Sequence, residues 1–191
     1  MQQISFSGTY IKPIMIKKLA QNGEFVPHEV SLVQFDARNK ADVDAIQRTY
    51  EEWSIVDNCF VEIIRDIAKW LHGSKTRQKS RKIFLLTNQQ YGFEKLNPNE
   101  ILGEFMVWKP KHSKTVEVEV IQTNPFHNYD AGEFRQYTEI GQSMLDEIKE
   151  QYAGNILQLR SDKYATGFYE KNGFIPDEPN SLDYTFNPLS L

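Results

Sequence analysis

The segment from Gln136 to Gln142 is the clearest candidate for an anion-binding site in this sequence. It leads into a predicted helix, and the first turn of a helix has backbone N–H groups without intrahelical partners at the positive end of the helix dipole. Gly141 would let a phosphate approach the backbone closely. Glu139, in the same loop, is not a glycine and carries a negative charge. Its carboxylate either points to solvent or points inward and repels an anion. An ordinary helix start with a glutamate in its first turn stays as the alternative.

Carboxylates on predicted strands are the candidates for a general base. A carboxylate is ionised at neutral pH and can accept a proton from an attacking nucleophile. Glu104 lies on one predicted strand, and Glu117 and Glu119 lie on the next one. Because glutamates on strands are most often solvated, each of the three also has a purely structural interpretation.

The composition excludes several classes of protein. The chain has 191 residues and a formal net charge of −4, whereas a dedicated nucleic-acid binder is normally basic. Its single cysteine, Cys59, excludes an intramolecular disulfide and multi-cysteine zinc sites, and no histidines have metal-pair spacing. Hydrolase, NTPase and dinucleotide signatures are absent. With no membrane-length apolar run and no signal-peptide pattern, we expect one cytoplasmic domain over residues 1–191.

The first part of the chain is predicted to contain strands followed by helices. Residues 1–35 are rich in β-type apolar positions, with a turn at Asn22-Gly23. Residues 41–53 and 54–73 have apolar side chains at helical spacing.

The second part is predicted to alternate between strands and helices. Three strands over 83–86, 101–108 and 116–123 form an antiparallel meander, and in the third Val116, Val118 and Val120 alternate with Glu117, Glu119 and Ile121. A helix from near Gly141 to Gly154, a strand over 156–159, a helix over 164–172 and a strand over 184–186 follow. This order predicts an α/β fold with a mixed, mostly antiparallel central sheet flanked by helices.

Two motifs in residues 80–175 match the pattern of a known family. The run Ala165-Thr166-Gly167-Phe168-Tyr169-Glu170-Lys171-Asn172-Gly173-Phe174 has an alanine, a tyrosine four residues later, then Glu-Lys, a variable residue and Gly-Phe. The segment 136–141 follows the pattern Gln or Arg, two residues, Gly, one residue, Gly or Ala, with Glu139 in place of the first glycine. In both motifs the chain resembles the GNAT superfamily of acyl-CoA-dependent N-acetyltransferases.

The resemblance implies transfer of an acetyl group from acetyl-CoA to a primary amine by direct attack, with the acceptor unidentified. Tyr169 corresponds to the tyrosine that protonates the departing thiolate, and Glu119 or a water is expected to be the base. The loop over 136–142 corresponds to the pyrophosphate cradle, and the strand end over 121–123 to the contact with the pantetheine arm. The cofactor-binding residues are therefore expected to be Ile121, Gln122, Thr123, Gln136, Tyr137, Thr138, Glu139, Ile140, Gly141, Gln142 and Asp162.

Other departures from the family pattern leave a second hypothesis open. Asp162 stands where family members often have an asparagine, and the insertion over 126–135 adds Asp130 and Glu133 beside Glu139. This acidic rim would either recruit a basic acceptor or indicate a catalytically silent module that binds a protein or a small ligand. The basic run over 75–82 is either a solvated loop or a site for the 3′-phosphate of CoA. We expect no metal, nucleic-acid or membrane partner, and a homodimer is one option for the oligomeric state.

Overall fold

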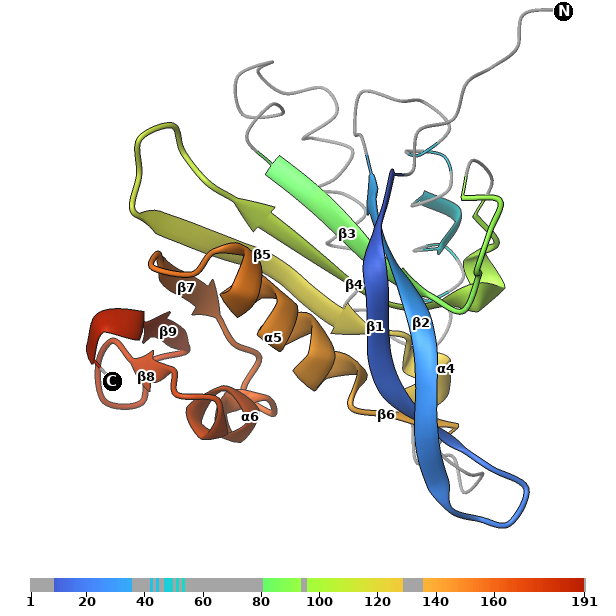
Figure 1. Ribbon diagram of the computed structural model, residues 1–191. Coiled ribbons are helices and arrows are strands. Elements are labelled where there is room, and N and C mark those ends of the chain that lie inside the picture. Colours follow the sequence, from blue (N-terminus) through green and yellow to red (C-terminus); the bar gives the residue numbers. More distant parts are fainter. Residues whose placement is uncertain are drawn as a thin grey trace, which may run out of the picture.

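One mixed sheet organises the part of the chain that the structure describes (Figure 1). The computed structural model describes residues 9–35, 81–93, 96–128 and 136–190, with 42, 44, 47–49, 51 and 53. The strand order is β6-β1-β2-β3-β4-β5-β7-β9-β8, and every neighbouring pair is antiparallel except β5 and β7. The strands are β1 (Thr9–Leu19), β2 (Phe25–Phe35), β3 (Arg81–Thr87), β4 (Ile101–Trp108), β5 (Thr115–Thr123), β6 (Tyr137–Thr138), β7 (Ile156–Arg160), β8 (Ile175–Pro176) and β9 (Asp183–Phe186). The helices are α4 (Pro125–Asn128), α5 (Ile140–Gln151) and α6 (Thr166–Lys171), with 3-10 turns over Pro98–Glu100 and Pro188–Ser190.

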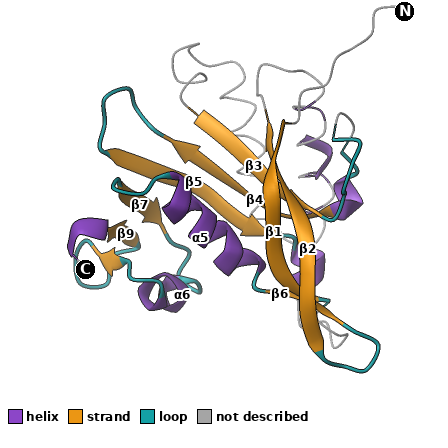
Figure 2. Cartoon of the chain, viewed as in Figure 1, coloured by secondary structure: helices purple, strands orange, loops and turns teal. Residues whose placement is uncertain are grey.

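The predicted α/β class with a mostly antiparallel sheet is confirmed (Figure 2). Gly23 adopts φ 83° in the predicted turn between β1 and β2, and the described residues of the helix predicted over 41–53 are helical. The two-residue strands β6 and β8 were too short to predict. The second predicted helix with Cys59, residues 75–80 of the basic run and residues 129–135 of the insertion lie outside the described residues.

The apolar alternation predicted for β5 breaks within the strand. Val118 pairs with Val107 of β4 and Val120 pairs with Met106, so Glu119 is the extra residue of a β-bulge. Val116 and Val118 belong to the core, but beyond the bulge it is Ile121, and not Val120, that packs against the core. The bulge therefore changes which face each later residue of β5 presents.

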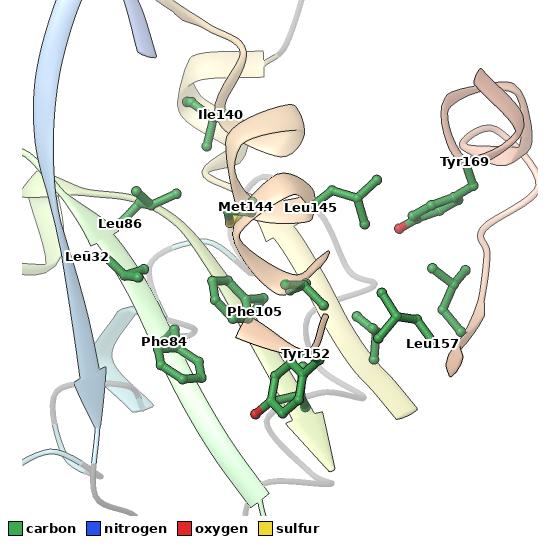
Figure 3. Packing of buried hydrophobic residues seen from close by; sticks show 14 of the residues in the cluster. Leu32, Phe84, Leu86, Phe105, Ile140, Met144, Leu145, Tyr152, Leu157 and Tyr169 are labelled. Atoms are coloured by element: carbon green, nitrogen blue, oxygen red, sulfur yellow. The ribbon is translucent and has the colours of Figure 1, made fainter. Parts of the chain in front are cut away.

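Helix α5 covers one face of the sheet and closes the main core (Figure 3). Met144, Leu145 and Ile148 are fully buried, and they meet Phe84 and Phe105 from neighbouring strands. On its other side α5 is tied to β1 by Lys12, whose Nζ lies 2.6 Å from the buried carboxylate of Glu147. These contacts fix where the N-terminus of α5 lies relative to β5.

No helix among the described residues is both long and apolar enough to cross a bilayer.

The close approach of α5 to β4 depends on Gly103. A Cβ at this position would lie 2.9 Å from Ile140 Cγ2 and 3.0 Å from Met144 Cε. We expect Gly103→Ala to force the Ile140 and Met144 side chains to repack in the core and to lower the free energy of unfolding by about 1–3 kcal/mol. Thermal denaturation measures this loss, with Gly167→Ala as the control because a Cβ there meets open space. Equal melting temperatures of the two variants would contradict the expected strain.

Candidate functional site

The site lies where β5 and β7 separate. The two strands pair in parallel from Thr115 and Ile156 to Val118 and Leu159. β5 then continues to Thr123, past the bulge at Glu119, without a further β7 partner. The open side of this strand end faces a cavity of about 680 Å³, which the N-terminus of α5 and helix α6 also line.

Most of the predicted site residues line this one cavity. They come from three separate segments of the chain, namely the end of β5, the loop that enters α5 and the helix α6. The predicted residues in its wall are Ile121, Gln122, Thr123, Tyr137, Thr138, Glu139, Ile140, Gly141, Gln142 and Tyr169.

Three predicted residues do not line the cavity. The backbone carbonyl of Gln136 accepts a hydrogen bond from the Leu19 N–H at 2.9 Å, which joins the loop to β1. The Asp162 carboxylate accepts a hydrogen bond from the Tyr164 N–H at 2.8 Å and so holds a turn. The third residue is Glu119.

Glu119 lies on the face of the sheet opposite α5. Its carboxylate forms a two-point ion pair with Arg81 of β3. Arg81 pairs in register with Trp108 of β4, and neither residue belongs to the core on the α5 face. Together with Glu117 and Arg160 it lines a second cavity of about 340 Å³. Its role as the base stays a prediction, and the structure adds that both of its oxygens already accept hydrogen bonds from Arg81.

The loop that enters α5 is the candidate anion site, and it has an unusual residue at its centre. Glu139 adopts φ 67° and ψ 9°, a left-handed conformation that favours glycine, which explains physically why a glycine suits this position. Its side chain does not cap the helix. Instead, the carboxylate lies 2.6 Å from Lys17 Nζ, and both side chains are about half exposed. The Glu139 side chain therefore does not cap the first turn of α5, and its carboxylate is paired with Lys17 of β1.

The space above this turn is open because residue 141 is glycine. A Cβ at Gly141 would lie 3.7 Å from Phe168 Cζ and 3.8 Å from Thr123 Cγ2, which is ordinary contact. Any longer side chain would extend into the cavity. The neighbouring Gln142 is oriented by hydrogen bonds from its Nε2 to Asn172 Oδ1 at 2.7 Å and to Asp146 Oδ1 at 2.9 Å.

Tyr169 is buried on α6, and its ring points toward Leu145 of α5 (Figure 3). The ring contacts Phe168 and Phe174 edge-on, with centroid distances of 5.2 and 5.8 Å. Burial raises the pKa of the Tyr169 phenol to about 12. The phenol is therefore a proton donor that stays protonated at neutral pH, placed in the cavity wall opposite the end of β5.

Four further wall residues were not predicted from the sequence. Met144, Tyr164, Ala165 and Phe168 line the same cavity. The i, i+4 spacing of Tyr164 and Phe168 beside Tyr169 is a signal that could have indicated a shared face. Among the described residues, no group of three or more His, Cys, Asp or Glu side chains is arranged to hold a metal ion.

Comparisons with known proteins agree with this architecture at the level of the fold. No family model matches the chain, and no curated protein matches it. Among solved structures, it is similar to the PaiA N-acetyltransferase from Thermoplasma acidophilum in complex with coenzyme A, at 14% identity and a TM-score of 0.53, over 82% of this chain and 96% of that one. It is also similar to a protein from Desulfovibrio desulfuricans described as an acetyltransferase of the GNAT family, at 13% identity and a TM-score of 0.53, over 83% of this chain and 99% of that one. The chain therefore has the fold of the GNAT acetyltransferases.

Proposed function

We propose that this protein is an N-acetyltransferase that transfers an acetyl group from acetyl-CoA to a primary amine. The observation that carries the proposal is the single cavity that brings together the uncapped turn of α5, the unpaired edge of β5 and the phenol of Tyr169. A protein of the same fold, the PaiA acetyltransferase, is solved with coenzyme A. The acceptor amine is left unspecified because one fold serves many acceptors.

The residues present fit an acyl-CoA molecule. The backbone N–H groups from Ile140 to Gln142 suit the diphosphate, since a helix N-terminus attracts negative charge. The cavity volume of about 680 Å³ suits the arm that follows. Beyond Val118, β5 has no strand partner on the cavity side among the described residues, so its backbone is available for hydrogen bonds to amide groups of that arm.

In this proposal each part of the wall has a chemical role. Acetyl-CoA supplies a thioester whose carbonyl carbon the amine attacks directly. A backbone N–H between Ile121 and Thr123 polarises the carbonyl oxygen, and Tyr169 donates its proton to the departing thiolate. Glu119 or an ordered water accepts the proton of the amine, and the ion pair of Glu119 with Arg81 favours the water.

The test is a calorimetric titration of acetyl-CoA and CoA, followed by a screen of primary amines for release of free thiol. Micromolar binding and amine-dependent thiol release support the proposal. Binding of CoA without thiol release in the presence of any amine would favour the alternative, a silent GNAT-like binding module. Its supporting observation is Glu139, an acidic residue that lines the cavity and whose carboxylate is paired with Lys17. No binding at millimolar CoA would overturn acetyl transfer.

Glu139→Gly tests how the unusual residue affects the anion site. Glycine relieves a left-handed conformation that costs other residues roughly 1–2 kcal/mol, while the lost pair with Lys17 is exposed and worth at most about 1 kcal/mol. We therefore expect the stability to be unchanged or slightly higher. The affinity for CoA should rise several-fold, since a negative charge leaves the site and Lys17 becomes available to phosphate. Calorimetry measures the affinity.

Glu139→Gln is the matched control for the backbone effect, because it removes the charge and keeps a side chain at the same φ. An affinity gain shared by both variants assigns the effect to charge. A weaker affinity in both would contradict the expected repulsion.

A further inference from the structure

Tyr164 is an aromatic side chain that the fold leaves unusually open at the rim of the cavity. The residue is 85% exposed, yet it lines the cavity together with the first turn of α5. The Nζ of the neighbouring Lys163 lies 4.6 Å from the centre of its ring. The ammonium lies over one face of the ring, and because most of the residue is exposed, the ring can still stack on a flat aromatic group that has a negatively charged substituent.

The turn that carries this pair is held in place by hydrogen bonds. Asp162 accepts one from the Tyr164 N–H at 2.8 Å, and its backbone carbonyl accepts one from the Ala165 N–H at 3.0 Å. The preceding residue, Ser161, is buried, and its N–H donates to the Leu182 carbonyl at 2.7 Å. The sequence suggested a contact of Asp162 with the cofactor arm, whereas the structure gives its carboxylate a place in this turn.

Tyr164 lines the α6 side of the cavity, next to the first turn of α5. Phe168, four residues after Tyr164, reaches within 3.7 Å of the position that a Cβ of Gly141 would occupy. Tyr164, Phe168 and Gly141 all line the same cavity. A ligand whose phosphates bind at Gly141 and whose arm runs along β5 therefore has its remaining end at the rim, near the exposed ring.

We infer that Lys163 and Tyr164 bind the nucleotide end of CoA, with the adenine stacked on the Tyr164 ring and the 3′-phosphate paired with the Lys163 ammonium. The inference rests on the proposed function and adds selectivity to it. Aromatic stacking is tolerant of which base is bound, so the phosphate contact supplies the discrimination. The site therefore selects acyl donors that carry a phosphorylated nucleotide over thioesters that end at the pantetheine arm.

The test compares CoA with 3′-dephospho-CoA by calorimetry on the full chain. We expect the unmodified protein to bind CoA about tenfold more tightly than dephospho-CoA, in line with a charge-assisted contact. Lys163→Ala should weaken CoA binding to the level of dephospho-CoA and leave the latter unchanged. Tyr164→Ala should weaken both ligands about tenfold, and Tyr164→Phe should restore them because stacking needs only the ring.

Matched controls of the same residue types are available at exposed positions. Lys171→Ala removes an exposed lysine at the end of α6, and Tyr91→Ala removes a tyrosine that is 83% exposed and does not line the cavity. Unchanged CoA affinity in both Lys163→Ala and Tyr164→Ala, with binding intact in the unmodified protein, would overturn the inference and leave acetyl transfer standing. If the unmodified protein binds neither ligand at millimolar concentration, both proposals fail.

Discussion

Tyr169→Phe is expected to lower kcat about 100-fold or more while KM for acetyl-CoA stays nearly constant, because general acid catalysis typically contributes that much or more to a rate. The substitution removes only the hydroxyl. The ring contacts with Phe168 and Phe174 are kept, so the packing of α6 against the core should survive. Steady-state kinetics with an amine found in the screen measures the effect.

The pH dependence gives this prediction a second readout. Burial raises the pKa of Tyr169 to about 12, so the acid is fully protonated at neutral pH and is lost only as the pH rises toward that value. A fall in rate on the acidic side of the profile therefore belongs to the base or to the amine. Tyr169→Phe should lower the whole profile without moving its acidic limb.

Tyr152→Phe is the matched control for the loss of a buried hydroxyl. Burial also raises the pKa of Tyr152 to about 12, but this residue lies at the C-terminal end of α5 and does not line the cavity. We expect the control variant to keep its kcat. Unchanged turnover in Tyr169→Phe, or an equal loss in both variants, would contradict the role of Tyr169 as the acid.

The strand and helix order was predictable because it depends on local patterns, whereas the details of the site depend on long-range contacts. The alternation of β5 predicted a strand correctly, but a bulge adds one residue to one strand only, and that becomes visible only against β4. For this reason Glu119 could not be assigned to a face, and its pairing with Arg81, 38 residues earlier, could not be foreseen.

Long-range contacts also explain which features of the candidate anion site could be predicted from the sequence and which could not. The loop over 136–142 was predicted from its helix start and from the resemblance, and the structure brings most of it into one cavity with Tyr169. The direction of the Glu139 carboxylate was left open, because its partner Lys17 comes from β1 at the other end of the chain. Sequence spacing gives the type of a site, and tertiary packing decides which way each charge points.

Gly141→Leu is expected to weaken CoA binding at least 100-fold, because a side chain beyond Cβ would occupy the space over the first turn of α5. Loss of even two charge-assisted hydrogen bonds to phosphate corresponds to such a factor. Gly141→Ala, in contrast, should bind CoA with little change, since its Cβ would make only ordinary contacts with Phe168 and Thr123. Calorimetry on both variants gives the affinities.

In the Gly141→Leu variant, the free energy of unfolding should rise or stay equal while the affinity for CoA falls. A loss of binding can therefore be distinguished from a loss of folding. Replacing a helical glycine by alanine or leucine stabilises a helix by up to about 1 kcal/mol, so Gly141→Leu should melt no lower than the unmodified protein. Gly167→Leu on α6 is the control, because a Cβ there meets open space and the residue does not line the cavity. A Gly141→Leu variant that stays folded and still binds CoA would mean that the diphosphate does not bind at the first turn of α5. This result would contradict the proposal that the cavity between β5, α5 and α6 is an acyl-CoA site.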